Sequence, residues 1–533
     1  MAQRTPWWRG ATFYHIYVRS WRDSNGDGIG DLTGVCQGLD YLQWIGTDAI
    51  WLSPTMPSPN TDWGYDVSDY RDVHPDLGTL ADLDLLVEDA NRRGIAVMLD
   101  LVPNHTSSAH PWFIDALSGR TATYRGYYVW APPKADASPP NNWLDATGRS
   151  AWTYDPSSGE SYLHNFLPTQ PDLNWWDERV HEEFEQILRF WWDRGIAGFR
   201  IDVAHGLYKD ALLRDNPPPS ALDHPMLSRS ALKPVYNSHR PEVHALYRRW
   251  RQIADGYQPA RALLGETWEF DYERFGDFYG RDGDELNLAF NFPFVFSDLQ
   301  SVSLAETVEA TLAALPPGAT PVWTASNHDV GRFPSRWCGG NERAVKAALA
   351  VLASLPGTVV LYYGDELGML DVDVPPELRL DEMTILRPGR EGRDRCRTPM
   401  PWSAAKNAGF TADGARPWLP IGEHGSINVQ SEQADPASVL NFWHQLSLLR
   451  REGRLGALAD VERLLLDDQI WAFAVGDVAT VANLSDRAAK TKLGDIGTRT
   501  VLVSTGLSRH GQRVPEEVEL EPWEVLILAP VAP

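Results

Sequence analysis

Eight apolar runs typical of β-strands recur between residues 12 and 363, and most are followed by a segment with helical periodicity. This alternation predicts βα units and a parallel sheet. Eight units predict an α/β protein built on a (β/α)8 TIM barrel, in which active sites lie at the carboxyl ends of the strands. The strand-like runs are 12–19, 48–53, 95–101, 195–205, 261–266, 285–291, 321–326 and 358–363, and the predicted helices are 39–45, 80–93, 177–193, 242–254 and 342–355.

The barrel pattern is interrupted once and ends before the chain does. Between residues 105 and 173 the sequence is rich in Trp, Tyr, Pro, Gly and Asn, which predicts an inserted domain after the third strand. After a last helix at 435–451, short β runs predict a small all-β domain, a β-sandwich. The predicted domains are the barrel (1–104 and 174–455), the inserted domain (105–173) and the C-terminal domain (456–533).

Composition limits the partners of the chain. A net charge of −24 argues against nucleic acid or an anionic membrane, and no run of about 18 apolar residues predicts a membrane span. Three cysteines (Cys36, Cys338 and Cys396) and first residues without a signal-peptide core predict a reduced, cytoplasmic protein. The 23 Trp, 18 Tyr and 17 Phe offer rings on which sugars stack, although core packing must account for most of them. The oligomeric state stays open between a monomer and a homodimer.

Acidic and amide residues alternate directly after the first strand. Residues 23–31 place oxygen ligands on every second position, as in the first half of a calcium loop. The twelfth position, where an EF-hand carries a bidentate Glu, is Gly34, so the pattern is incomplete. We predict a structural Ca²⁺, with Mg²⁺ as the alternative ion, while a metal-free acidic loop of Asx turns is the competing interpretation. The expected ligands are Asp23, Asn25, Asp27, the carbonyl oxygen of Ile29, and Asp31. No organic cofactor is expected.

Three carboxylates, Asp202, Glu266 and Asp329, follow the fourth, fifth and seventh predicted strands, so a barrel would turn them toward one pocket. Two carboxylates beside a glycosidic bond are the minimal apparatus for its hydrolysis. Arg200 and Asp202 point the same way, because side chains alternate along a strand. We expect Arg200 to lower the pKa of Asp202 and to keep it ionised as a nucleophile.

The other side chains at these strand ends suit supporting roles. Burial and nearby negative charge favour the protonated form of Glu266, which a general acid needs. A retaining enzyme would hold the oxygens of Asp202 and Glu266 about 5–5.5 Å apart. Asp329 would hold sugar hydroxyls and favour a distorted ring. Taken singly, each residue has a structural alternative, such as an ion pair that closes a strand or a loop histidine. The side chains expected to contact the sugar as donors or by stacking are His105, His328 and Tyr65.

Four segments resemble the signatures of the alpha-amylase family, glycoside hydrolase family 13. They are Asp-Leu-Val-Pro-Asn-His at 100–105, Gly-Phe-Arg-Ile-Asp-Val-Ala-His at 198–205, Gly-Glu-Thr-Trp at 265–268 and Ser-Asn-His-Asp at 326–329. Their order and the position of the inserted domain match the family over nearly the whole chain. The resemblance implies Asp202 as nucleophile, Glu266 as acid/base and Asp329 as stabiliser of the transition state.

A fifth segment, Gln-Pro-Asp-Leu-Asn at 170–174, is similar to that of oligo-1,6-glucosidases and alpha-glucosidases. The 23–31 loop also looks like the single cation site of that subgroup. The resemblance implies a pocket that is closed behind a terminal glucose, so that short alpha-glucosides are attacked from the non-reducing end. The residues implied to line that pocket are Asp62, Tyr65, His105, Phe166, Gln170, Arg200, His328 and Arg397.

The residues after the nucleophile bear on the linkage that is cleaved. Val203 resembles enzymes that cleave alpha-1,6 bonds, whereas Ala204-His205-Gly206 looks like enzymes that take maltose-type substrates. One methyl-for-hydroxyl difference contributes about 1–3 kcal/mol, which biases the choice without deciding it. Two other function classes remain: a glucosyltransferase or sugar isomerase similar to trehalose synthase, and a non-catalytic, transporter-associated relative. The complete carboxylate set and the lack of an anchor argue against the latter.

Overall fold

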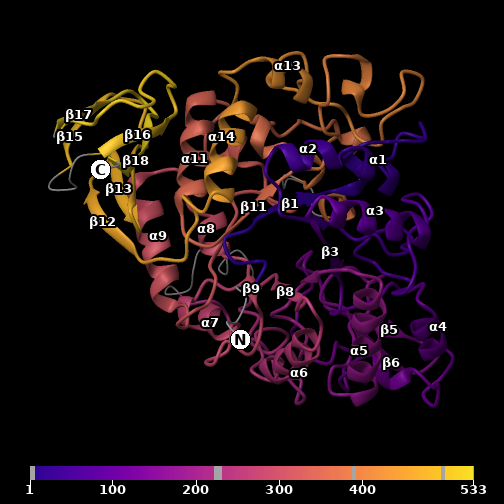
Figure 1. Cartoon of the computed structure of the whole chain (residues 1–533). Coiled ribbons are helices and arrows are strands. Elements are labelled where there is room, and N and C mark those ends of the chain that lie inside the picture. Colours follow the sequence, from indigo (N-terminus) through magenta and orange to yellow (C-terminus); the bar gives the residue numbers. More distant parts are fainter. Residues whose placement is uncertain (1–5, 221–230, 387–391, 494–498, 516, 532–533) are drawn as a thin grey trace.

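The computed structural model describes residues 6–220, 231–386, 392–493, 499–515 and 517–531. Residues 1–5, on which the expectation about the first residues partly rests, lie outside these ranges. Figure 1 shows a central barrel with the C-terminal strands and the inserted segment on opposite sides of it.

Eight parallel strands form the barrel and confirm the predicted fold class. Every ladder in this sheet is parallel, and the strand order is β10-β11-β1-β2-β3-β7-β8-β9. In the described ranges no ladder joins β9 to β10, so the barrel is nearly closed. The strands are β1 (Thr12–Ile16), β2 (Ala49–Leu52), β3 (Ala96–Leu101), β7 (Gly198–Ile201), β8 (Ala262–Gly265), β9 (Leu288–Ala289), β10 (Val322–Trp323) and β11 (Thr358–Tyr362).

Helices surround the barrel, and their ends follow local capping signals. Asp177 caps α5 by accepting from the N–H of Arg179, and Thr79 and Asp82 form a capping box at the start of α3. Gly195 follows α5 with φ +96°, a conformation that turns the chain into β7 at little cost only for glycine. The helices are α1 (Leu32–Gln37), α2 (Leu39–Trp44), α3 (Leu80–Arg92), α5 (Glu178–Asp193), α6 (Val243–Asp255), α7 (Tyr272–Asp277), α8 (Phe292–Val295), α9 (Ser301–Ala314), α10 (Phe333–Arg336), α11 (Glu342–Ser354), α12 (Glu382–Ile385), α13 (Val429–Ala434) and α14 (Val439–Arg451).

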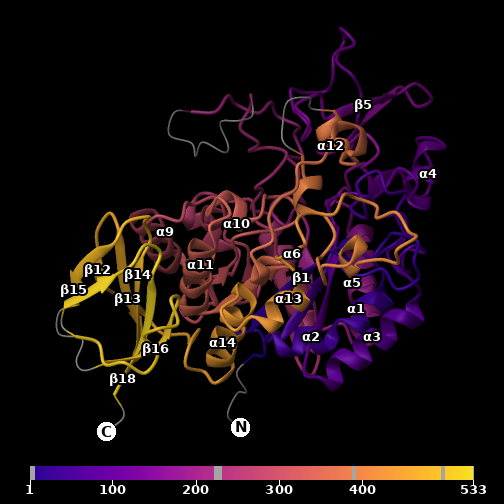
Figure 2. The ribbon, with the colours of Figure 1, turned by 90° about the horizontal axis from the view of Figure 1, so that it is seen from above.

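The inserted segment holds helix α4 (Pro111–Leu117) and a small antiparallel sheet. The sheet has the order β4-β6-β5, with β4 (Trp130–Ala131), β6 (Glu160–Leu163) and β5 (Trp152–Asp155). Its own core is built on Trp143, Trp152 and Leu163, against which Leu213 and Tyr236 from the loop after β7 pack. Figure 2 shows this segment and α12 on the same side of the barrel, where both contribute to one cavity.

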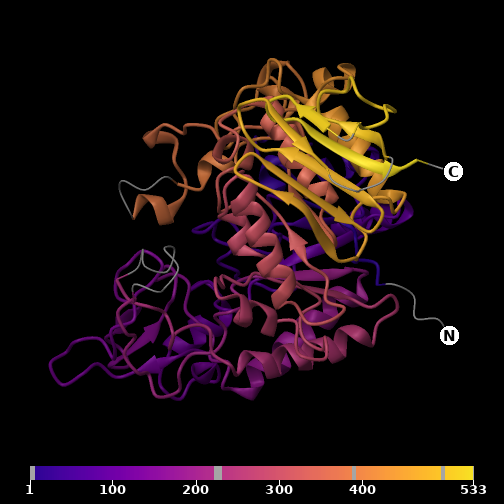
Figure 3. The same ribbon diagram turned by 90° about the vertical axis from the view of Figure 1, so that its left-hand side faces the viewer.

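Two antiparallel sheets make up the C-terminal region, as predicted. The larger has the order β12-β13-β14-β18-β16 and the smaller pairs β15 with β17. Alternate residues of the larger sheet face α9 and α11 (Trp471, Phe473) or the smaller sheet (Ala472, Val481), so both of its faces are covered (Figure 3). The strands are β12 (Val461–Leu466), β13 (Ile470–Val475), β14 (Val478–Asn483), β15 (Ala489–Lys492), β16 (Arg499–Ser504), β17 (Glu517–Leu520) and β18 (Val525–Pro530).

The structure corrects the extent of several predicted elements. The run 12–19 is a strand only to Ile16, and a 3-10 turn, Val18–Ser20, follows it. The runs 285–291 and 321–326 shrink to β9 and β10, of two residues each. Helix α1 was not predicted, because Gly34 lies inside its six residues and weakens the helical signal.

Candidate active site

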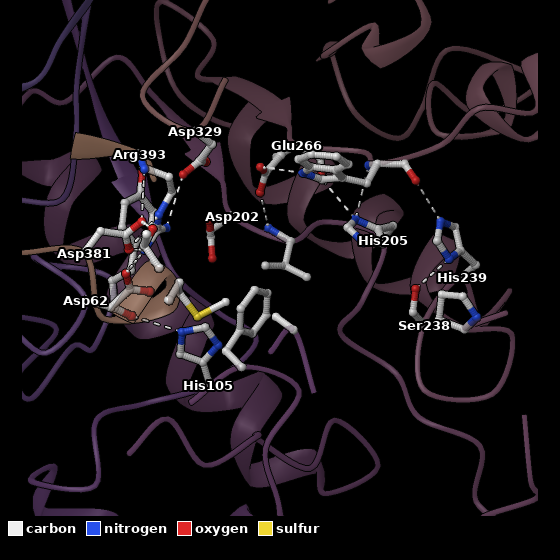
Figure 4. Close-up of a pocket in the computed structure, with 18 of the residues that line it drawn as sticks. Asp62, His105, Asp202, His205, Ser238, His239, Glu266, Asp329, Asp381 and Arg393 are labelled. Carbon is white, nitrogen blue, oxygen red and sulfur yellow. Dashed lines mark hydrogen bonds and ion pairs between the residues drawn. The ribbon is translucent and has the colours of Figure 1, made fainter. Parts of the chain in front are cut away.

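A cavity of about 500 Å³ opens at the carboxyl ends of the barrel strands (Figure 4). Seven of the eleven predicted catalytic and sugar-contacting residues line it: Asp62, Tyr65, His105, Phe166, Asp202, Glu266 and Asp329. The other four do not reach the cavity surface and lie behind its walls, at 1% exposure or less: Gln170, Arg200, His328 and Arg397. These four therefore support the lining residues by contacts from behind.

Arg200 joins three carboxylates beneath the cavity. Its Nη1 lies 2.8 Å from Asp100 Oδ1 and 2.7 Å from Asp202 Oδ1, and its Nη2 lies 3.0 Å from Glu266 Oε1. The register of the sheet causes the first contact, since Asp100 of β3 pairs directly with Arg200 of β7. Asp202 and Glu266 are thereby held on the two terminal nitrogens of one guanidinium group.

Burial dominates the electrostatics of Asp202. It raises the pKa of this carboxyl well above its ordinary value, Arg200 opposes the rise, and Glu266 and Asp100 add to it. Burial likewise raises the pKa of Asp100 to about 6. The predicted lowering of the Asp202 pKa is therefore wrong in direction, because burial of the carboxyl outweighs the attraction of a guanidinium that three carboxyls share. The protons of this cluster belong to the group as a whole.

Glu266 is held by donors on both of its oxygens. The backbone N–H of Val203 donates to Oε2 at 2.9 Å, and the indole Nε1–H of Trp268 donates to Oε1 at 2.9 Å. Val203 has φ +47°, a left-handed conformation that is rare for a β-branched residue and that costs about 1–3 kcal/mol. This strain is localised at the residue that directly follows Asp202.

Asp329 lies between two arginines that follow β11. Arg393 Nη1 is 3.3 Å and Arg397 Nη2 is 3.1 Å from its Oδ1. Arg397 is completely buried and also donates from Nε to the carbonyl of His328 at 2.8 Å. The predicted Arg397 thus positions Asp329 and its neighbour, while Arg393 forms part of the cavity surface.

Arg393 was missed by the sequence analysis, together with Asp381. Arg393 Nη2 lies 2.6 Å from both Asp62 Oδ1 and Asp381 Oδ1, so that it links the loop after β2 to the segment after β11. Gln170 donates from Nε2 to the second oxygen of Asp62 at 3.0 Å. The sequence offered several arginines between 393 and 397, and charge alone could not tell which of them faces the cavity.

Tyr65 and His328 stack at the floor of the cavity. Their rings are 5.1 Å apart and almost parallel, and the Tyr65 hydroxyl donates to Asp100 Oδ2 at 2.8 Å. Burial lowers the pKa of His328 well below its ordinary value, and Arg397 and Arg200 act in the same direction, so the imidazole is neutral. His105 lies next to Tyr65, with its Nε2 3.0 Å from the Tyr65 carbonyl oxygen, and its ring centroid is 5.1 Å from that of Phe166.

A second group of lining residues holds His205, which the sequence analysis named only for its bearing on the linkage, and two residues that it missed, Ser238 and His239. Figure 4 shows His205, Ser238 and His239 beyond Glu266, on the far side from Asp62 and Arg393. The imidazoles of His205 and His239 are 4.7 Å apart, and His239 Nε2 lies 3.1 Å from the carbonyl oxygen of Trp268. Segments after β7 and β8 build this wall, and no strand-end motif identified Ser238 or His239.

The 23–31 loop forms a run of Asx turns. Asp23 accepts backbone N–H groups from Asn25 and Gly26 on Oδ1 and from Gly28 on Oδ2, at 2.7–3.0 Å. Asp31 caps α1 by accepting from Gly34 N–H at 2.6 Å. Within the described ranges no three His, Cys, Asp or Glu side chains are grouped as metal ligands. The Asx turns are compatible with both interpretations of the loop, and the bound cation stays a prediction.

Comparison with known proteins identifies the family. A model of the family described as "Alpha amylase, catalytic domain" matches residues 15–457. The chain belongs to the alpha-amylase family. It is 39% identical to a "Probable alpha-glucosidase" from Rhizobium meliloti (strain 1021) over 505 residues, 91% of either chain. It is 34% identical to an "Oligo-1,6-glucosidase" from Parageobacillus thermoglucosidasius over 564 residues, 98% of either chain.

Solved structures agree with this assignment. An alpha-glucosyl transfer enzyme, XgtA, superimposes with a TM-score of 0.91 at 36% identity, covering 99% of this chain and 100% of that one. Membership of the alpha-amylase family confirms the resemblance that the four signatures indicated, and the chain is a glycoside hydrolase. Of the helices in the described ranges, none combines the length and the apolar character that crossing a membrane requires.

Proposed function

We propose that this member of the alpha-amylase family is a retaining, exo-acting alpha-glucosidase that releases alpha-glucose from the non-reducing end of short alpha-glucosides. The observation that carries the proposal is the placement of Asp202 and Glu266 on one guanidinium at the surface of a 500 Å³ cavity. Two carboxylates beside one bond are what a retaining mechanism needs.

In the first step Asp202 attacks the anomeric carbon while the bond from that carbon to the leaving oxygen breaks. Glu266 gives its proton to the leaving oxygen, and a covalent glucosyl-Asp202 ester forms. In the second step Glu266 takes a proton from water, whose oxygen attacks the anomeric carbon and displaces Asp202. Two inversions give net retention. Asp329, oriented by Arg393 and Arg397, holds hydroxyls of the distorted ring.

The ion pairs at one end of the cavity support exo-action. Asp62, Arg393 and Asp329 come from three different strand ends and are connected to one another there. We expect this charged wall to stop a sugar chain from continuing beyond it. The hydroxyls of a sugar bound there meet fixed donors and acceptors, which orients the anomeric carbon toward Asp202.

The linkage stays open between maltose-type alpha-1,4 and isomaltose-type alpha-1,6 bonds. The names of the relatives, alpha-glucosidase and oligo-1,6-glucosidase, support both. Some transglucosylation is expected, because a sugar hydroxyl can replace water in the second step. A small molecule is the only partner that the proposal requires.

Proton NMR of the protein with maltose and, separately, with isomaltose tests the proposal. Alpha-glucose should appear first from the non-reducing unit of the preferred disaccharide, before mutarotation produces the beta anomer. Beta-glucose as the first product would contradict retention. The faster substrate names the linkage.

A glucosyltransferase or sugar isomerase is the second candidate. The similarity to a solved alpha-glucosyl transfer enzyme favours it, since hydrolysis and transfer share the same intermediate. In the same NMR experiment, new disaccharide signals that grow faster than free glucose would favour this alternative and leave the site assignment intact.

A further inference from the structure

Trp268 donates a hydrogen bond to Glu266 that has no part in the bond-making and bond-breaking steps of the proposed hydrolysis. Its Nε1–H donates to Oε1 of Glu266, two residues earlier, at 2.9 Å. The Val203 N–H binds the other oxygen at 2.9 Å, and Arg200 Nη2 lies 3.0 Å from Oε1. Each partner is a donor, so each stabilises the carboxylate relative to the carboxylic acid.

The indole is held in place before any substrate arrives. Its ring stacks on Phe292 with centroids 4.3 Å apart and planes 23° apart, and Phe292 itself is fully buried at the start of α8. The backbone N–H of Trp268 lies 3.3 Å from His205 Nδ1. The donor therefore reaches Glu266 without paying much conformational entropy on substrate binding.

We propose that Trp268 is a positioning residue that holds the Glu266 carboxyl for proton transfer and thereby shapes the pH dependence of the reaction. The charged and titratable groups around Glu266 are Arg200, Asp202 and Asp100 on the β3–β7 side and His205 on the loop after β7. Among the described residues none of these groups bonds to the indole side chain. Removing the indole donor therefore takes away one contact of the Glu266 carboxyl and leaves its other contacts in place. The inference rests on the proposed function only in that Glu266 transfers the proton.

Trp268→Phe removes the donor and keeps a ring to stack on Phe292. The alkaline limb of kcat/KM for maltose, which requires protonated Glu266, should move up by about 1 pH unit, because the carboxylate has lost a charge-assisted hydrogen bond. An alkaline limb that coincides with that of the wild type overturns the proposal.

Two variants separate this effect from packing. Phe292→Leu loosens the stack but keeps the N–H, so it should lower the melting temperature and leave the alkaline limb in place. Trp176→Phe removes an indole donor that binds the Lys209 carbonyl at 2.9 Å, away from Glu266, and should move neither. A limb that shifts equally in Phe292→Leu would mean that packing is responsible.

A readout without turnover keeps this inference separate from the glucosidase assignment. The ¹⁵N-indole resonance that disappears in Trp268→Phe should titrate with pH in the wild type, whichever sugar is cleaved. If that resonance does not respond to pH, the proposal fails even in an active glucosidase.

A second inference concerns the opposite end of the barrel. A cavity of about 700 Å³ lies there among the residues that precede β1, β2, β3, β7 and β8 and the end of α14. Its single carboxylate is Asp48, in a chain of net charge −24. Four arginines line it: Arg9, Arg261, Arg450 and Arg451.

These arginines contact backbone carbonyls rather than acids. Arg9 donates to Gly318 at 2.6 Å, Arg261 to Trp192 at 3.1 Å and Arg451 to Gln43 at 3.3 Å. In the part of the chain that the structure describes, no carboxylate lies within 4.0 Å of any of the four guanidinium groups. The bonds to Trp192 and Gln43 cap the ends of α5 and α2, and Asp48 is the one carboxylate of the lining that opposes the four positive charges.

The excess of positive charge destabilises the fold most at Arg450, because this residue is buried. It is 6% exposed, donates to the carbonyls of Gly10, Ala353 and Gly357, and burial lowers its pKa to about 10. Arg261 adds a buried Nε that has no hydrogen-bond partner among the described residues. A bound anion would offset both effects, since an uncompensated buried charge destabilises a fold.

The geometry points to a binding site for a phosphate group at this end of the barrel, either free phosphate or the phosphate of a metabolite. Arg9, Arg261 and Arg451 keep free N–H groups, and phosphate is an anion that guanidinium groups bind bidentately. Such a ligand would stabilise the fold from the side opposite to the active site.

Melting curves in inorganic phosphate and in sodium chloride at equal ionic strength test this site. Phosphate stabilises most proteins by exclusion from their surface, so the decisive quantity is the difference between variants. The saturable rise in wild-type melting temperature should be lost in Arg261→Gln and kept in Arg92→Gln, on the outer face of α3. Equal rises in both variants overturn the proposal.

Calorimetric titration then distinguishes the two sources of the phosphate group. Glucose 6-phosphate that binds at least tenfold more tightly than inorganic phosphate would indicate a phosphorylated metabolite, and equal affinities would indicate phosphate alone. Wild-type protein that releases no heat with either ligand at millimolar concentration contradicts the site.

Discussion

The two walls of the active-site cavity are built in different ways. One carries Asp62, Asp329 and Arg393, charged groups that come from separate strand ends and bind one another (Figure 4). The other carries His205 and His239, whose rings contact backbone atoms and each other. Asp202 and Glu266 lie between the two walls.

The difference separates two kinds of recognition. A network of buried ion pairs fixes the directions of its donors and acceptors, so the charged wall suits a single sugar in a single pose. The imidazoles contact backbone atoms and each other, so they fix fewer hydrogen-bond directions for a ligand. The histidine wall therefore suits the leaving group of the substrate, which varies more than the terminal sugar. Substitutions on the histidine wall should therefore change the preference between linkages, while the terminal sugar still binds to the charged wall.

The largest loss of activity is expected for substitutions of the two carboxylates between the walls. Asp202→Asn and Glu266→Gln should each lower kcat by at least about 10³-fold, because each removes a group that forms or breaks a bond. Steady-state kinetics with maltose and isomaltose measure the loss, and circular dichroism checks that the fold is intact. Near-normal turnover in either variant would contradict the mechanism.

On the charged wall, Arg393→Met should lower kcat/KM about 100-fold, since it leaves Asp62 and Asp381 without their closest partner. Arg393→Lys should restore little, because an ammonium group cannot replace the planar fork that binds three carboxylates. Equal losses for all substrates are expected. A loss confined to one linkage would place Arg393 in leaving-group recognition instead.

Val203 should change the preference between substrates. Val203→Thr adds a hydroxyl at the cavity surface and should shift the isomaltose-to-maltose ratio of kcat/KM toward maltose by about tenfold. Competition between the two disaccharides in one tube measures the ratio directly. An unchanged ratio would remove Val203 from linkage recognition.

The smallest effect concerns pH. Burial lowers the pKa of His205 well below its ordinary value, so its imidazole stays neutral over the working range and its titration cannot produce the acidic limb of activity. His205→Asn should therefore change kcat/KM only a few-fold and leave the acidic limb where it is. A displaced acidic limb would mean that His205 titrates with the carboxylates.

The positions of the three carboxylates at strand ends were predictable from the sequence. Asp202, Glu266 and Asp329 follow apolar runs, and the parallel sheet brings such positions together. The choice of Arg393 over Arg397 was not predictable, because it depends on how the long segment after β11 folds back over the cavity. His239 follows no strand signal at all.

The electrostatics were harder to predict than the positions. The pairing of Arg200 with Asp202 could be predicted from the sequence, but the direction of the Asp202 pKa shift could not. Burial raises that pKa, and Asp100 and Glu266 share the guanidinium that opposes the rise. The left-handed Val203 was also hidden, since a β-branched residue gives no sign of positive φ. Both depend on contacts between distant segments.

The sharing of Arg200 among three carboxyls has a consequence for the order of events in a catalytic cycle. In the proposed mechanism Asp202 loses its negative charge when it becomes an ester, and the guanidinium would then have one fewer anion to neutralise. Its field falls more strongly on Glu266, at the moment when that residue has just become a carboxylate and must next accept a proton. The first half of the reaction thus prepares the charge balance for the second, and hydrolysis of the ester restores the starting state.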